Sequence, residues 1–237
     1  MAPQACLPSC GGTLVGMSTS AWPLFNLGIR CREVKLQPVR DSDLPYLASI
    51  RPDGYEHDPR AEMLSGLSIR QNRERLVYQG YWRSLGTWSQ SSWCLDLAVE
   101  YQGVIVGVQS LEANDFPALR TVDSGSWLVR FVRGRGVGVA MRMAVLGLAF
   151  DHLGALAAVS SARTDNGASL GVSRRIGYTD NGVSLNDSGH GRVELRHMRL
   201  IPQDWRASGQ GSQVIVNGSE PCLPWFGQLS ANRANGA

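Results

Sequence analysis

Ser126-Trp-Leu-Val-Arg-Phe-Val-Arg-Gly-Arg-Gly-Val-Gly-Val-Ala140 is the stretch that decides the fold of this chain. It is typical of an apolar strand followed by a glycine- and arginine-rich turn that opens into an amphipathic helix. Glycines let backbone N–H groups approach a ligand closely, a helix start adds unpaired donors, and arginines add formal positive charge. We therefore expect the turn to bind a phosphate or pyrophosphate through five residues: Arg133, Gly134, Arg135, Gly136 and Gly138.

Two common phosphate-binding motifs are excluded by the residues around the glycines. A Walker P-loop requires Gly-Lys-Ser/Thr, and Lys35 is the only lysine in the chain. A dinucleotide-binding loop requires the spacing G-x-G-x-x-G and an acidic residue at the end of the next strand. Here the glycines alternate, and the next apolar run, over residues 155–159, is followed by Ser160 and Ser161.

Two motifs in the same order resemble the GNAT acyltransferase family. Arg133-x-x-Gly136-x-Gly138 is similar to the acyl-CoA pyrophosphate loop R/Q-x-x-G-x-G/A of that family. Asp165-Asn-Gly-Ala-Ser-Leu-Gly-Val-Ser-Arg-Arg-Ile-Gly-Tyr178 resembles the element N-x-x-A/S followed by G-F/Y that closes the cofactor site. Asn166 lies 30 residues after Gly136, which leaves room for one helix and one strand. The resemblance implies a mixed α/β fold, with a twisted, mostly antiparallel sheet whose central parallel pair splays into a V between flanking helices.

The resemblance covers roughly residues 22–206 and extends to one branch of the family. The segments over residues 123–128 and 141–146 look closest to ribosomal-protein-type N-acetyltransferases and their actinobacterial succinyl-CoA-using relatives. Trp22-Pro-Leu-Phe, Val214-Ile-Val-Asn-Gly and Pro224-Trp-Phe-Gly227 also resemble the actinobacterial members. Val139-Ala140 departs from the branch, which carries Thr-Glu there, and the missing Glu bears on how the acceptor binds.

We divide the chain into three parts: a disordered leader over 1–16, an acyltransferase domain over 17–206 and a C-terminal extension over 207–237. Met17 is a candidate start, and the leader lacks the features of a signal peptide. In the extension, residues 214–216 could add an edge strand, and Trp225 and Phe226 are predicted to be exposed. Exposed aromatic residues favour a homodimer, although folding back on the same subunit explains them equally well.

Composition fits a single enzyme domain: 43% of the 237 residues are hydrophobic and 18% are charged. A net charge of +3 is too small to indicate nucleic acid as a partner, and no stretch is apolar enough to span a membrane. The five cysteines are odd in number and scattered, which favours a reducing, cytoplasmic location without disulfides. No His/Cys cluster indicates a metal.

Apolar periodicity predicts the helix after the turn, with Val137, Met141, Ala144, Val145 and Leu148 on one stripe. Arg142 lies off that stripe. We expect the helix to end near Leu153 with Gly154 as a left-handed cap, and a short buried strand to follow over 155–159.

The resemblance implies transfer of an acyl group from acetyl-CoA or succinyl-CoA to a primary amine by direct attack. The amine must lose a proton to a base, and the departing thiolate is helped by a hydroxyl donor. By resemblance to the branch, Ser169 is the predicted donor and Ser173 is its reserve. Ser169 could equally well only bind the first turn of its own helix.

The resemblance also assigns the cofactor contacts. Asn166 would bind the pantetheine arm or cap its helix, and the two roles can coexist. The strand before the turn would pair with the pantetheine amides, with an oxyanion contact from a backbone N–H near Val129. The predicted cofactor-binding residues are Trp127, Leu128, Val129, Arg133, Gly134, Arg135, Gly136, Val137, Gly138, Asn166 and Ser169. Arg130, or another arginine, could pair with a succinyl carboxylate.

Three residues around the last predicted hairpin are candidates for the base: Glu194, Asp187 and His190, with Glu194 preferred. Residues 55–58 in the loop after the first helix are candidates for the acceptor side. In both places a solvated surface is the simpler explanation. A competing function from another class is a non-catalytic domain that binds acyl-CoA and regulates.

Overall fold

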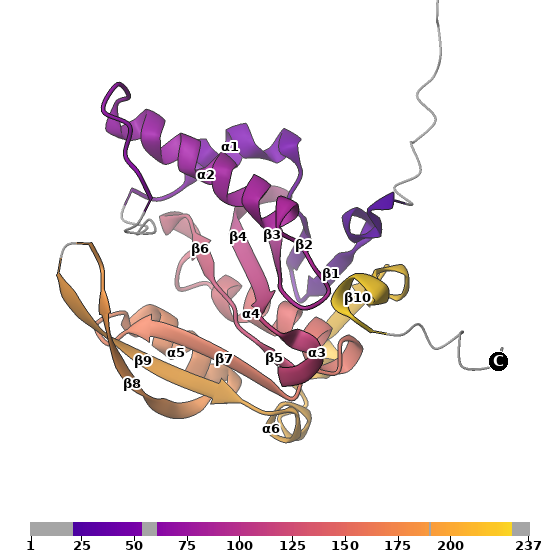
Figure 1. Ribbon diagram of the computed structural model, residues 1–237. Coiled ribbons are helices and arrows are strands. Elements are labelled where there is room, and N and C mark those ends of the chain that lie inside the picture. The colour runs from indigo at the N-terminus through magenta and orange to yellow at the C-terminus, as the bar shows by residue number, and fades with distance from the viewer. Residues whose placement is uncertain (1–20, 54–60, 190, 229–237) are drawn as a thin grey trace, which may run out of the picture.

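The computed structural model describes residues 21–53, 61–189 and 191–228. Within these residues, ten strands lie in two sheets, and the helices pack around and between them (Figure 1). The strands are β1 Gly28–Cys31, β2 Val34–Pro38, β3 Trp93–Tyr101, β4 Val104–Ala113, β5 Thr121–Val122, β6 Ser126–Leu128, β7 Ala157–Arg163, β8 Thr179–Asp187, β9 Arg192–Leu200 and β10 Val214–Asn217. The α-helices are α1 Leu44–Ile50, α2 Ile69–Gly86, α3 Phe116–Leu119, α4 Val137–Gly147, α5 Gly167–Ile176 and α6 Pro202–Ala207. Short 3-10 turns are η2 Pro23–Asn26, η3 Asp41–Asp43, η4 Arg130–Val132, η6 Gln210–Gln213 and η7 Glu220–Phe226, and η5 Leu148–His152 is π-helical.

The strand that was expected from Ser126 into the glycine turn is β6, and the short strand β5 that precedes it belongs to the other sheet. β6 ends the antiparallel sheet β10-β1-β2-β3-β4-β6, whereas β5 begins the sheet β5-β7-β9-β8 and pairs parallel with β7. The chain therefore changes sheets between Val122 and Ser126, and the edge of β6 is left unpaired beside β7. This arrangement is the predicted V, and it confirms the predicted fold class.

Helices lie on both faces of the sheets. In Figure 1, α1 and α2 lie over the strands of the first sheet, and α5 lies against the second. α4 packs against β1, β2, β4 and β10 and against α5, so almost every side chain on it is buried. Arg142, which was expected off the apolar stripe, is only 3% exposed, because α4 is covered all round.

The predicted end of the helix after the glycine turn is confirmed. α4 continues through η5, and Gly154 follows with φ +63° as a left-handed cap. The strand expected over 155–159 is β7, which starts two residues later and continues to Arg163. Its last residues are not buried on both faces, because Ser161 is exposed where only the neighbouring strand β9 flanks it.

The prediction that the aromatic residues of the tail are exposed is wrong. Phe226 is fully buried, and its ring packs edge-on against Trp93 and Trp88 at centroid distances of 4.8 and 5.5 Å. Trp225 is half-buried, and its carbonyl accepts a hydrogen bond from Trp88 Nε1. The described part of the tail, up to residue 228, thus folds back on its own subunit, which was the alternative explanation for its aromatic residues. In the part of the chain that the structure describes, no helix is long and apolar enough to cross a membrane.

Candidate active site

The glycine turn forms a cradle of free backbone donors at the start of α4. Gly134 and Gly136 have φ values of +76° and +81°, and Gly136 is the N-cap of the helix. Among the described residues, none accepts a hydrogen bond from the N–H groups of residues 134–138. Alternating left-handed glycines and a helix start make such a run a binding site for an anion.

Gly138 has a different role from the other two glycines. A Cβ on Gly138 would lie 3.3 Å from Val172 Cγ2, whereas Cβ atoms on Gly134 and Gly136 would meet nothing within 4 Å. Gly138 therefore lets α5 approach α4 closely, and the two left-handed glycines set the direction of the N–H groups.

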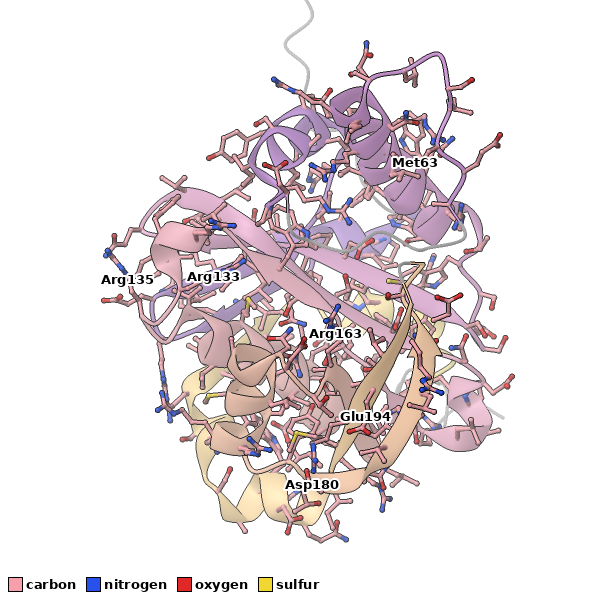
Figure 2. All side chains as sticks on the ribbon, turned by 90° about the vertical axis from the view of Figure 1, so that its left-hand side faces the viewer. Met63, Arg133, Arg135, Arg163, Asp180 and Glu194 are labelled. Carbon is pink, nitrogen blue, oxygen red and sulfur yellow. The ribbon has the colours of Figure 1, made fainter. Side chains whose placement is uncertain are left out.

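The two arginines of the turn lie at the same edge of the molecule but differ in their contacts (Figure 2). The Arg133 guanidinium donates to the Leu128 carbonyl oxygen, from Nε at 3.3 Å and from Nη2 at 3.0 Å. It thereby ties the turn to the end of β6. Arg135 is exposed and makes no hydrogen bond to a described residue, so its charge faces solvent.

The main chain of Leu128, and not that of Val129, faces the V. The Val129 N–H donates to the Val106 carbonyl at 2.9 Å, and Gly107 pairs with Leu128 in the β4–β6 register. Because donors alternate along a strand, the N–H and C=O groups of Leu128 point away from β4, toward the open edge. The oxyanion contact was predicted from an N–H near Val129, and among the described residues it is the neighbouring Leu128 N–H, rather than that of Val129 itself, that is left without an acceptor.

The start of α5 brings two predicted residues together. Asn166 is the N-cap, and its Oδ1 accepts from the Ser169 N–H at 3.1 Å, which is the capping role that was predicted. Ser169 is half-buried in the first turn, whereas Ser173 is only 2% exposed, one turn further on. A ligand that lies along the open edge of β6 can reach Ser169 more easily than Ser173.

Glu194 and Asp187, two of the three predicted base residues, lie on the second sheet, where Figure 2 labels Glu194. Glu194 is exposed on β9, and its carbonyl accepts from the Thr164 N–H, which fastens β9 to the turn before α5. Strand alternation puts the Glu194 side chain on the same face as Met198, which is buried in the core. Asp187, on β8, is opposite Arg192 and shares this face. His190 and residues 55–58 lie outside the described residues.

A carboxylate that sequence reasoning did not select lies where the chain changes sheets. Asp123 bridges to Glu112 and stands on the opposite face to Glu194, the face that α1 and α2 cover. Burial raises the pKa of Asp123 and outweighs the hydrogen bond from the Ser124 N–H and the charge of Arg142, both of which lower it. The only sequence signal was a polar residue at the end of an apolar strand.

His197 and the departure at residues 139–140 are both structural. His197 Nδ1 lies 2.8 Å from Ser161 Oγ and its Nε2 lies 2.7 Å from Ser184 Oγ, so hydroxyl partners occupy both ring nitrogens. Val139 and Ala140 are buried in α4, so they contribute to packing rather than to acceptor contacts. Among the described residues, no group of three or more His, Cys, Asp or Glu side chains is arranged to hold a metal ion.

The described residues thus form a mixed α/β fold in which a run of free backbone donors lies beside the open edge of a split sheet. The family model for the acetyltransferase (GNAT) domain matches residues 33–179, and the chain belongs to this family.

Solved structures agree in fold. Mycobacterium smegmatis RimJ in complex with CoA-disulfide has a TM-score of 0.62 and 19% identity, covering 80% of this chain and 96% of that one. A GNAT acetyltransferase from Bacillus anthracis has a TM-score of 0.58 and 12% identity, and the match covers 74% of this chain and 99% of that one. The microcin C7 self-immunity acetyltransferase MccE in complex with acetyl-CoA and AMP has a TM-score of 0.56 and 16% identity, and the match covers 71% of this chain and 92% of that one.

Proposed function

We propose that this protein binds acyl-CoA through residues 133–138 and transfers an acetyl or succinyl group to a primary amine by direct attack. The observation that carries the proposal is the run of five backbone N–H groups, from Gly134 to Gly138, without a described acceptor. A pyrophosphate fits this cradle, because two left-handed glycines aim the donors outward and the helix start favours an anion. MccE and RimJ, both similar in fold, were solved with acetyl-CoA and CoA-disulfide.

Acyl-CoA supplies an activated thioester carbonyl, and the chain supplies groups on three sides of it. The open edge of β6 offers the Leu128 N–H to the carbonyl oxygen and to the pantetheine arm. Ser169 stands at the start of α5 and would donate a hydrogen bond to the departing sulfur. The nitrogen–carbon bond forms as the carbon–sulfur bond breaks, and the surplus proton of the amine passes to a carboxylate.

Glu194 remains the predicted base, and Asp123 is a second candidate. Asp123 is favoured by its position on the face that α1 and α2 cover and by a pKa that burial raises toward the working pH. The pH–rate profiles of Glu194→Gln and Asp123→Asn separate the two. The base is the residue whose substitution removes the fall in rate at low pH, while the other variant keeps it.

The donor is tested first by calorimetry with CoA, acetyl-CoA and succinyl-CoA, and then by CoA release with primary amines. Arg130 is exposed at the start of η4, directly after β6, and would pair with a succinyl carboxylate. Arg130→Met should then reduce kcat/KM for succinyl-CoA and leave acetyl-CoA unaffected. Absence of any CoA binding would refute the proposal, and binding without turnover of any amine would favour the regulatory domain.

We also infer a cytoplasmic location, which the free thiols of Cys31, Cys94 and Cys222 support.

A further inference from the structure

A cavity of about 230 Å³ lies between the helices α1 and α2 and the strands β3, β4 and β6. It exceeds the volume of about 150 Å³ that is enough to hold benzene in an engineered protein core. Most of its wall is apolar, contributed by Leu44, Leu47, Leu76, Val77, Val108 and Trp127. Trp127 belongs to β6, so the cavity borders the strand whose free edge we assign to the thioester. It lies on the opposite face of the first sheet from α4.

One carboxylate lies in this apolar cavity. Asp96 on β3 lines it, and its Oδ1 accepts from Ser110 Oγ at 2.5 Å and from Cys94 Sγ at 3.8 Å. Ser84 on α2 also faces the carboxylate, and Tyr81 is fixed nearby by a hydrogen bond from its hydroxyl to the Val39 carbonyl. All of these contacts come from neutral groups.

Among the described residues, no cation forms an ion pair with this carboxylate. Neither Asp96 nor Glu112, which adds negative charge beside it on β4, forms an ion pair within residues 21–53, 61–189 and 191–228. Arg51, at the end of α1, also lines the cavity and has an interaction of its own, but it forms no ion pair with Asp96. Burial raises the pKa of Asp96. Burial is also the main cause that raises the pKa of Glu112, and the charges of Asp123 and Asp96 raise it further. A buried carboxylate without a cation is costly, and a cationic ligand that enters the cavity would remove that cost.

Asp96 is too far from the thioester edge to contact the attacking nitrogen. β4 lies between β3 and β6, and two strand spacings amount to about 10 Å. A ligand with one amine at the Leu128 edge would therefore need a second charge about 10 Å away to reach Asp96. The apolar wall between these two points suits an aliphatic chain.

We propose that this cavity is the acceptor subsite and that Asp96 binds the distal ammonium of an aliphatic diamine whose other amine is acylated. This inference rests on the proposed function for the second amine, but the binding of the distal ammonium can be measured without turnover. Asp96 is a specificity residue in this scheme and takes no part in proton transfer.

Calorimetry at pH 8 with 1,8-diaminooctane and octylamine tests the subsite directly, since the two ligands differ mainly in the terminal charge. The wild-type protein should bind the diamine at least tenfold more tightly. Asp96→Asn should remove this preference, with a larger loss for the diamine than for octylamine, which carries a single ammonium at pH 8; the fold should be kept, because an amide still accepts from Ser110. Glu100→Gln, an exposed carboxylate on the same strand that pairs with Lys35, is the matched control and should keep the preference.

Gly80→Leu provides a second test that does not depend on the charge. Gly80 lines the cavity from α2, and a Cβ placed on it meets nothing within 4 Å, so a leucine can fill the space while improving helix propensity. Both amines should lose at least tenfold in affinity. Equal binding of the two amines to the wild type, or an unchanged diamine preference in Asp96→Asn, would overturn the subsite.

Turnover separates this inference from the proposed function. Equal KM values for octylamine and the diamine, with normal CoA release, would overturn the subsite alone. Intact diamine binding that needs Asp96, without acylation of any amine, would overturn the transferase and support the subsite.

Discussion

The substitution Gly136→Ala isolates the role of the left-handed backbone in the phosphate cradle. Gly136 has φ +81° and caps α4, and an added Cβ would meet nothing within 4 Å, so the substitution introduces no clash. Its cost is the left-handed conformation itself, about 1–2 kcal/mol for a residue with a Cβ. Without bound CoA, the turn of the variant can avoid this cost by rotating away from the left-handed region, and its N–H groups then no longer point in one direction. Binding of CoA must then restore the strained geometry, so we expect CoA affinity to fall about 5- to 30-fold.

Gly103→Ala is the matched control. Gly103 connects β3 and β4 with φ +80°, and its Cβ would also meet nothing within 4 Å. It therefore carries the same backbone cost in a hairpin remote from the cradle. Calorimetry with CoA and urea denaturation should show a loss of CoA affinity in Gly136→Ala only, and a loss of stability of about 1–2 kcal/mol in Gly103→Ala. Wild-type CoA affinity in both variants, or equal losses in both, would refute the cradle.

Three further substitutions test the donor, the buried charge and the tail. Ser169→Ala should lower kcat for amine acylation about 100-fold with CoA affinity unchanged, whereas the buried Ser173→Ala should stay within about twofold; equal losses would contradict the assignment. Burial raises the pKa of Asp96 above its ordinary 3.8, so the wild type loses stability as the pH rises from there through the folded pKa. Asp96→Asn should therefore gain stability relative to the wild type between pH 4 and 8 in urea titrations, and a difference independent of pH would count against a buried charge. Phe226→Ala should lower the free energy of unfolding by about 3–5 kcal/mol. Phe131→Ala, which removes an exposed ring, should lower it by less than about 0.5 kcal/mol. Similar losses in the two variants would mean that the tail is not part of the core.

The backbone geometry of the glycine turn could be predicted from the sequence because its determinants are contiguous. A strand, glycines at fixed positions and a helix start specify the direction of the N–H groups without help from distant residues. The same holds for the cap at Asn166 and the left-handed cap at Gly154, where a side chain or its absence decides the local backbone.

The sequence located the expected oxyanion donor only as near Val129, because the direction of each N–H group depends on a partner strand. Whether Leu128 or Val129 faces the V follows from the β4–β6 register, in which Gly107 is opposite Leu128. Nothing in the sequence around Val129 specifies that pairing. The split into β5 and β6 has the same origin, since each half is defined by a different neighbour.

Asp96 was missed because its significance comes from what covers it. The run Trp93-Cys-Leu-Asp-Leu-Ala-Val99 is typical of a strand with one apolar face, and an Asp on the other face would ordinarily be solvated. Here α2 lies over that face, and α2 carries no clear apolar stripe that would have predicted its docking. The wrong prediction for Phe226 has a similar cause, because its partners Trp88 and Trp93 are more than 130 residues away in the chain.

β6 connects the donor and acceptor sides through two adjacent residues. The Trp127 side chain lines the cavity that contains Asp96, and the Leu128 main chain faces the edge assigned to the thioester. Both are held against β4 by a close approach at Gly107, where a Cβ would lie 2.1 Å from the Trp127 carbonyl oxygen. Any side chain at Gly107 would move β6 and displace both residues together. If the proposed diamine subsite holds, the distance between its two ends is determined by the packing of one short strand, and the preferred length of the diamine is a property of the sheet.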